Sequence, residues 1–240
     1  TSAKHLIEEL KHENVESFQV PGFENAVQLE EKKNVFLTSA FKDGFFEVQD
    51  AGSQKIGEFL DVKPGMRVVD ACAGAGGKTL HLAALMENKG QIIAMDIHGW
   101  KLAELKRRAK RAGAHNIETR EITDNKVIKR LHEKADRLLI DAPCSGLGVL
   151  KRNPDSKWKI DQDFIDRIRK EQETILQDYS KIIKKGGKMV YATCSILPSE
   201  NNEQVENFLK NNSDFKLIKE EKVMPSTGFD GFYMALIERV

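Results

Sequence analysis

Cysteine is scarce in this sequence, long apolar runs are missing, and neither sign of charge prevails. The 240 residues include three cysteines. This count is low, and because it is odd the cysteines cannot all pair, which argues against a disulfide framework. We therefore expect free thiols in a reducing, cytoplasmic compartment. No window approaches the roughly 18 consecutive apolar residues of a membrane span, and no signal-peptide pattern opens the chain, so no membrane partner is expected. The formal net charge of +1 excludes the global basic field of a strongly basic nucleic-acid-binding domain, and any such affinity must come from local patches.

The first 49 residues predict a small α+β subdomain, which we expect to bind RNA. Helical spacing begins at once after Thr1, so we expect this subdomain to be truncated at its start. The predicted elements are a helix over 3–13 and extended segments over 17–20, 26–29 and 45–48.

Residues 50–240 predict a single α/β domain, because strand-like and helical segments alternate from Asp50 onward. The predicted strands are 67–70, 91–95, 118–122, 137–141, 188–193 and 231–237. The predicted helices are 78–87, 99–112, 160–184 and 200–210. This order indicates a Rossmann-like fold with a mostly parallel, doubly wound sheet, in which ligands bind at the carboxyl ends of the strands.

A glycine-rich loop over residues 70–79 joins the first of these strands to a helix. Its glycines allow close approach of a nucleotide-type ligand to the backbone and to a helix N-terminus. Gly77, Lys78 and Thr79 match the end of a P-loop, so a P-loop NTPase is an alternative. Cys72, however, occupies the position of the first P-loop glycine, and a dinucleotide fingerprint would need glycine at Thr79.

The next strand ends in Asp96, about 20 residues after the loop, where a carboxylate can accept both hydroxyls of a ribose. S-adenosylmethionine has a ribose and no phosphates, and the combination of loop and carboxylate favours it. Asp124 follows the third strand and either reaches the adenine or serves only as a turn residue.

Two cysteines follow neighbouring strands: Cys144 after the strand that ends at Asp141, and Cys194 after the strand that ends at Thr193. Each is flanked by polar or turn-forming residues at the edge where ligands bind. Carbon 5 of cytosine becomes nucleophilic enough to take a methyl group only after a group such as a thiolate adds to carbon 6. Asp141 can hydrogen-bond the base during that step.

The chain resembles the Nol/Nop/Sun family of RNA cytosine-5 methyltransferases, in particular the bacterial members that act on rRNA. The matching segments are 43–50 with Ser53 and Gln54, 72–78, Asp96, 141–146, Gln172, 193–195 with Glu200 and Asn201, and 230–232. The resemblance implies that Cys194 is the nucleophile and that Cys144 aids product release, with Lys78 and Asp141 near the target base. It implies a cofactor site for S-adenosylmethionine made of Cys72, Ala73, Gly74, Ala75, Gly76, Gly77, Lys78, Asp96, Lys101, Asp124 and Asp141. Ala75 stands where many members carry proline, and Lys101 where arginine is frequent.

The expected partner is RNA with an unstacked cytosine, most simply rRNA, with tRNA as the alternative. The basic run 106–111 favours a solvated helix face, because apolar residues recur on the opposite side. Segments 151–154 and 157–159 are better RNA candidates, since they combine cations with the aromatic Trp158. No metal is expected, and the chain is expected to be a monomer. A non-catalytic RNA-binding module of the same fold remains a further alternative.

Overall fold

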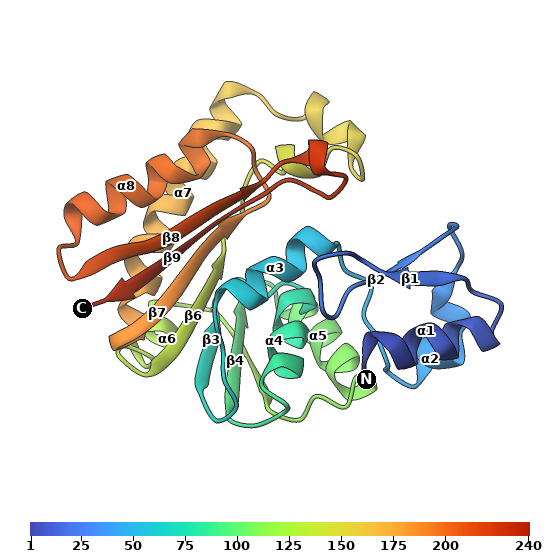
Figure 1. Cartoon of the computed structure of the whole chain (residues 1–240). Coiled ribbons are helices and arrows are strands. Elements are labelled where there is room, and N and C mark those ends of the chain that lie inside the picture. Colours follow the sequence, from blue (N-terminus) through green and yellow to red (C-terminus); the bar gives the residue numbers. More distant parts are fainter.

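A seven-stranded sheet forms the centre of the computed structural model, which describes residues 1–240 (Figure 1). The strands are β3 (Arg67–Asp70), β4 (Gln91–Asp96), β5 (Ile117–Glu121), β6 (Ala135–Asp141), β7 (Ile183–Thr193), β8 (Phe215–Val223) and β9 (Phe232–Arg239). Their order is β5-β4-β3-β6-β7-β9-β8, and all neighbours are parallel except β7 with β9 and β8 with β9. The predicted Rossmann-like, mostly parallel fold is therefore confirmed.

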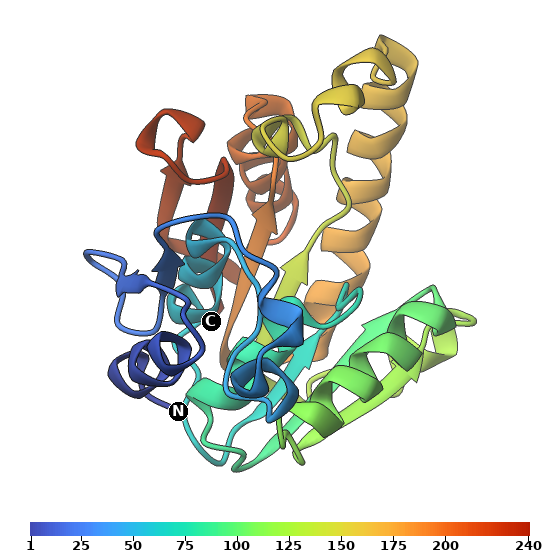
Figure 2. The ribbon, with the colours of Figure 1, turned by 90° about the vertical axis from the view of Figure 1, so that its right-hand side faces the viewer.

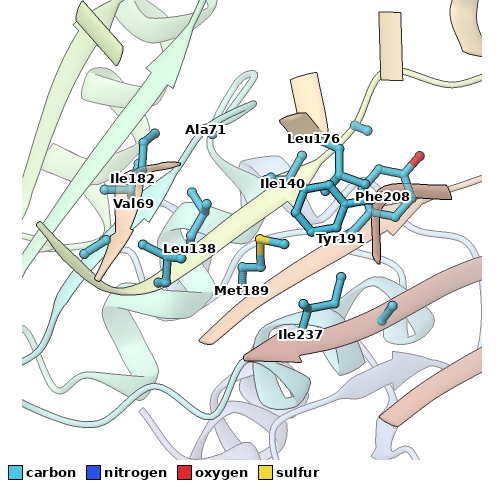
Figure 3. Close-up of a cluster of buried hydrophobic side chains, with 14 of the residues drawn as sticks. Val69, Ala71, Leu138, Ile140, Leu176, Ile182, Met189, Tyr191, Phe208 and Ile237 are labelled. Carbon is cyan, nitrogen blue, oxygen red and sulfur yellow. The ribbon is translucent and has the colours of Figure 1, made fainter. Parts of the chain in front are cut away.

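Helices cover both faces of this sheet, and the two faces carry separate apolar cores. The helices are α3 (Ala51–Phe59), α4 (Gly77–Leu85), α5 (Gly99–Arg111), α6 (Asn125–Lys129), α7 (Gln162–Tyr179) and α8 (Asn202–Asn211). Successive residues of β3 point to opposite sides, so that Val68 packs with α3 and α4 while Val69 packs in the cluster with α6, α7 and α8. Figure 3 shows the second cluster, in which Leu138, Met189 and Tyr191 lie together on neighbouring strands. Strands buried on both faces explain the nearly continuous apolar runs in the sequence.

The N-terminal segment forms α1 (Ala3–His12), the antiparallel pair β1 (Ser17–Gln19) and β2 (Val27–Leu29), and α2 (Ser39–Lys42). Leu6, Leu10 and Val35 belong to its own small core. Figures 1 and 2 show this segment, in blue, outside the central sheet. The Glu47 carboxylate holds it to α5 by ion pairs with Arg108 and Arg111.

Several sequence-based predictions of secondary structure are wrong. Residues 45–48 form no strand, because they run as irregular chain toward Asp50, whose side chain caps α3. The predicted helix 160–184 ends at Tyr179, because β7 already begins at Ile183, which pairs with Ala135 of β6. Four further elements were not predicted from the sequence: α2, α3, α6 and the edge strand β8. None of the helices combines the length and apolar character that crossing a membrane requires.

Candidate active site

The carboxyl ends of β3, β4, β6 and β7 meet at one edge of the sheet, as expected for parallel neighbours. The glycine loop after β3 turns sharply there, with Gly74 at φ 54° and Gly76 at φ 90°, a region that favours glycine. A Cβ at Gly76 would lie 2.5 Å from Cγ of Leu105, so the loop also packs tightly on α5. The loop therefore brings its backbone and the start of α4 to this edge.

Asp96 closes the side of the site next to the loop. The N–H groups of Gly74 and His98 donate to its two carboxylate oxygens at 2.9 and 2.8 Å. Asp96 is buried. Since each carboxylate oxygen can accept two hydrogen bonds, one acceptor position on each oxygen stays available. The arrangement suits a ligand that offers two neighbouring hydroxyls.

Asp70, at the end of β3, is a buried polar group that the sequence-based site did not include. The Thr79 hydroxyl donates to Asp70 Oδ2 at 2.7 Å, whereas Oδ1 has no hydrogen-bond partner. Burial raises the pKa of Asp70 to about 7. The signal that could have identified it is its position directly before the glycine loop. An unpartnered buried oxygen here fits a ligand that brings a donor or a positive charge.

Lys78 and Asp141 connect the glycine loop with the end of β6. Lys78 Nζ lies 2.7 Å from Asp141 Oδ2 and 5.7 Å from the centre of the Phe232 ring. Burial alone would lower the pKa of Lys78, but the Asp141 carboxylate outweighs it and the pKa is raised. The ammonium group therefore stays charged beside the cysteine loops.

The sulfur atoms of Cys144 and Cys194 are 3.3 Å apart. A hydrogen bond from Cys144 and the Lys78 cation lower the pKa of Cys194, against burial and the Asp141 charge. The pKa of Cys144 is raised well above its ordinary value, by its hydrogen bond to Cys194 and by burial. The two shifts favour the thiolate form at Cys194 and the thiol form at Cys144, with Cys144 as the donor between the two sulfur atoms. Burial and nearby carboxylates raise the pKa of Cys72, so its thiol stays protonated.

The structure brings together most of the predicted site residues, but two lie at its margin. Asp124 is exposed, and its carboxylate caps α6 by accepting the Lys126 N–H at 2.7 Å. Lys101 lies half-buried on α5, with Nζ 5.7 Å from the centre of the Trp100 ring. No group of three or more His, Cys, Asp or Glu side chains is placed to hold a metal ion.

The segment after the Cys144 loop carries the predicted RNA contacts. The Trp158 side chain is 80% exposed, and Lys157 Nζ lies 4.9 Å from the centre of its ring. Arg152 instead forms an ion pair with the buried Asp230. In the basic run 106–111, three side chains are exposed as expected, while Arg108 and Arg111 bind Glu47.

Comparison with known proteins gives consistent matches. The chain is 36% identical over 219 residues to a probable ribosomal RNA small subunit methyltransferase B of Synechocystis, a match that covers 90% of this chain and 49% of that protein. A methyltransferase homologue from Pyrococcus horikoshii has 28% identity and a TM-score of 0.86, covering 99% of this chain and 82% of that one. NSun6 from Pyrococcus horikoshii, solved with SFG, has 28% identity and a TM-score of 0.79, covering 90% of this chain and 60% of that one.

The chain spans about half the length of the curated relatives it matches. The model of the family described as 16S rRNA methyltransferase RsmB/F matches residues 58–237. This match confirms the family resemblance predicted from the sequence motifs. The chain belongs to the RsmB/F family of 16S rRNA methyltransferases.

Proposed function

We propose that this chain transfers a methyl group from S-adenosylmethionine to carbon 5 of a cytosine in ribosomal RNA, through a covalent bond between Cys194 and the base. The observation that carries the proposal is the pair of thiols, 3.3 Å apart, at the sheet edge that also holds the glycine loop and Asp96. Membership of a family of rRNA methyltransferases supports the reaction and the class of substrate. The same chemistry on tRNA is the alternative.

The residues at the ends of β3 and β4 fit S-adenosylmethionine as the cofactor. Asp96 keeps one acceptor position on each oxygen for the two ribose hydroxyls, and the unpartnered Oδ1 of Asp70 suits the positively charged methionine part. The backbone of residues 72–78 is open to close approach because of its glycines. The cofactor, when bound, supplies an electrophilic sulfonium methyl group.

Cys194 acts as the nucleophile in this proposal. A thiolate, rather than a thiol, adds to carbon 6 of the base, and the lowered pKa of Cys194 favours that species. As the sulfur–carbon bond forms, electron density moves into the ring. The Asp141 carboxylate can accept a hydrogen bond from the exocyclic amine of the base, and the Lys78 ammonium can donate a hydrogen bond to the ring. Both contacts stabilise the electron density that moves into the ring. Carbon 5 then becomes nucleophilic enough to take the methyl group.

Cys144 acts at the release step. Once carbon 5 is methylated, its proton passes to a base, the double bond between carbons 5 and 6 forms again, and the Cys194 thiolate leaves. Cys144 keeps its proton because its pKa is raised, and it lies in hydrogen-bond distance of the departing sulfur. A hydrogen bond to the leaving thiolate lowers the barrier to elimination.

RNA reaches the site along the exposed segment that follows the Cys144 loop. Trp158 offers a flat surface on which a base next to the target can stack, and Lys157 and Lys159 are exposed beside it. The target cytosine must leave its stack for carbon 6 to reach Cys194, so single-stranded or loop RNA is the proposed substrate.

The P-loop alternative finds little support in the geometry. A P-loop needs a free hydroxyl to bind Mg²⁺, whereas the Thr79 hydroxyl is buried and donates to Asp70. A non-catalytic RNA-binding module would not need a thiolate beside a thiol and an ion pair.

The function can be tested by incubating the protein with S-adenosylmethionine carrying a labelled methyl group and an rRNA transcript. Digestion to nucleosides and mass spectrometry should find the label in 5-methylcytidine. Label in another nucleoside, or tight ATP binding in place of S-adenosylmethionine, contradicts the proposal. A tRNA transcript in a parallel reaction separates the two RNA classes.

A further inference from the structure

A fully buried carboxylate lies behind the two thiols. Glu200, on the turn between β7 and α8, is 0% exposed. Its Oε1 accepts the hydroxyls of Ser145 and Ser195 at 2.5 and 2.6 Å. Its Oε2 accepts the Ser145 N–H at 2.8 Å and the Gln172 side-chain amide at 3.0 Å. A carboxylate has about four acceptor positions, so its capacity is fully used inside the protein.

The donors come from both cysteine loops. Ser145 and Ser195 directly follow Cys144 and Cys194 in the chain, and one carboxylate oxygen accepts from both of their hydroxyls. The side-chain amide of Gln172 also donates a hydrogen bond to the carbonyl of Pro143 at 2.9 Å. Pro143 directly precedes Cys144 in the chain, whereas Ser145 directly follows it. These hydrogen bonds therefore fix each loop at a residue directly next to its cysteine.

The neighbouring Asn201 strengthens the attachment of the Cys194 loop. Its Oδ1 accepts the Thr193 hydroxyl at 2.5 Å, and its Nδ2 donates to the Ser195 carbonyl at 3.0 Å. Asn201 is itself buried. Residues on both sides of Cys194 are thus fixed by the turn that carries Glu200.

A carboxylate is well suited to this place. Both loops present donors to the same buried point, and a group with several acceptor positions accepts from all of them at once. Removing the carboxylate would take the acceptor away from four buried donors. One serine hydroxyl could still donate to the other, 3.1 Å away, so three donors would be left without a partner, a cost that the loops relieve by moving apart.

We propose that Glu200 is a positioning residue that fixes the separation and relative orientation of the two thiols by joining the loops that carry them. The inference rests on the proposed function, in which both thiols act on one base. A displacement of about 1 Å at a reacting group can reduce a rate by about 100-fold. The negative charge of Glu200 is also one of the causes that raise the pKa of Cys144, which helps to keep that thiol protonated.

The separation of the thiols can be measured without RNA or cofactor. Dibromobimane becomes fluorescent when both of its ends react with neighbouring thiols, and peptide mass spectrometry then identifies the linked pair. The wild-type protein should link Cys144 to Cys194. Glu200→Ala should lose this link, while the Glu200→Gln variant should retain it, because the serine hydroxyls can turn to accept from the new amide. Glu203→Gln, on the exposed side of α8, is the matched control and should behave as wild type.

Kinetics give the second measurement. Glu200→Ala should lower kcat by about 100-fold while leaving the Kd for S-adenosylmethionine unchanged, with Glu200→Gln partly restoring kcat. A Glu200→Ala variant that links its thiols at the wild-type rate overturns the inference. If that variant does not fold, Ser195→Ala, which removes one donor on the nucleophile's loop, should reduce linking, and wild-type linking there overturns it equally. A wild-type protein that links its thiols but methylates no cytosine refutes the proposed function alone.

Discussion

Replacing Cys144 with alanine should slow two steps of the proposed reaction, attack on the base and release of the product. The Cys144 thiol lies 3.3 Å from the sulfur of Cys194 and is the first cause of its lowered pKa. A hydrogen bond to a charged group is worth about 1.5 kcal/mol, so its loss should reduce the thiolate population at neutral pH, and the rate of attack on the base, about tenfold. Release should slow as well, because no thiol remains to assist the departing sulfur, and a covalent complex with RNA should accumulate.

The sign of the pH dependence follows from the direction of the pKa shift. Without Cys144 the pKa of Cys194 rises, because burial and the Asp141 charge are no longer outweighed, so attack is weakened at neutral pH and recovers at alkaline pH as Cys194 ionises. Cys194→Ala removes the nucleophile and should give no complex at any pH.

Rapid-mixing experiments with target RNA and S-adenosylmethionine, stopped in denaturant and separated by electrophoresis, measure the complex as a slowly migrating band. Initial rates between pH 6 and 10 give the profile. Two results would refute the reasoning: a complex formed by Cys194→Ala, or a Cys144→Ala profile that superimposes on that of the wild type.

Three further changes test other parts of the structure. Asp96→Ala should weaken S-adenosylmethionine binding by about 30-fold or more, because two hydrogen bonds to a carboxylate are lost; unchanged affinity in calorimetry would remove Asp96 from the site. Trp158→Ala should raise the KM for RNA by about tenfold without changing cofactor affinity, since one stacked base is lost; an unchanged KM would exclude Trp158 from the RNA path. Burial lowers the pKa of His81 from 6.5 to about 4, so the native state resists protonation and should lose up to about 3 kcal/mol of stability as pH falls from 6.5 to 4. In denaturant titrations, the His81→Leu variant should lose less free energy of unfolding over this pH range than the wild type. An equally large loss in the variant would contradict the attribution of this pH dependence to His81.

The sequence predicted the sheet where local pattern and tertiary environment agree. β3, β4 and β6 are apolar on both faces because both faces are buried, and this produces runs that are visible without a structure. β8 was missed because it lies at the edge of the sheet, where eight of its nine positions, from Phe215 to Lys222, are half-exposed or exposed. Pairing with β9 stabilises β8, and the sequence of β8 alone gives no sign of that pairing.

The site shows the same division. Asp96, Lys78 and the two cysteines were predicted because each follows a strand or lies in a loop with a recognisable pattern. The role of Asp70 depends on its burial and on an oxygen without a partner, and that of Glu200 on donors from segments 55 and 5 residues away in the chain. Such partners become neighbours only when β6 and β7 pair, so spacing in the sequence could not reveal them.

The different roles proposed for the two cysteines rest on what surrounds them rather than on the residues themselves. In the sequence both are thiols that follow a strand, and only the family resemblance separated nucleophile from assistant. In the structure their surroundings differ. The hydrogen bond from Cys144 and the Lys78 cation lower the pKa of Cys194, against burial and the Asp141 charge. The hydrogen bond to Cys194, burial and the Glu200 carboxylate raise the pKa of Cys144. Because Cys144 donates to Cys194, each protonation state also stabilises the other. The hydrogen bond from Cys144 outweighs burial and the Asp141 charge at Cys194, so the surroundings of the pair support the proposed attack by Cys194.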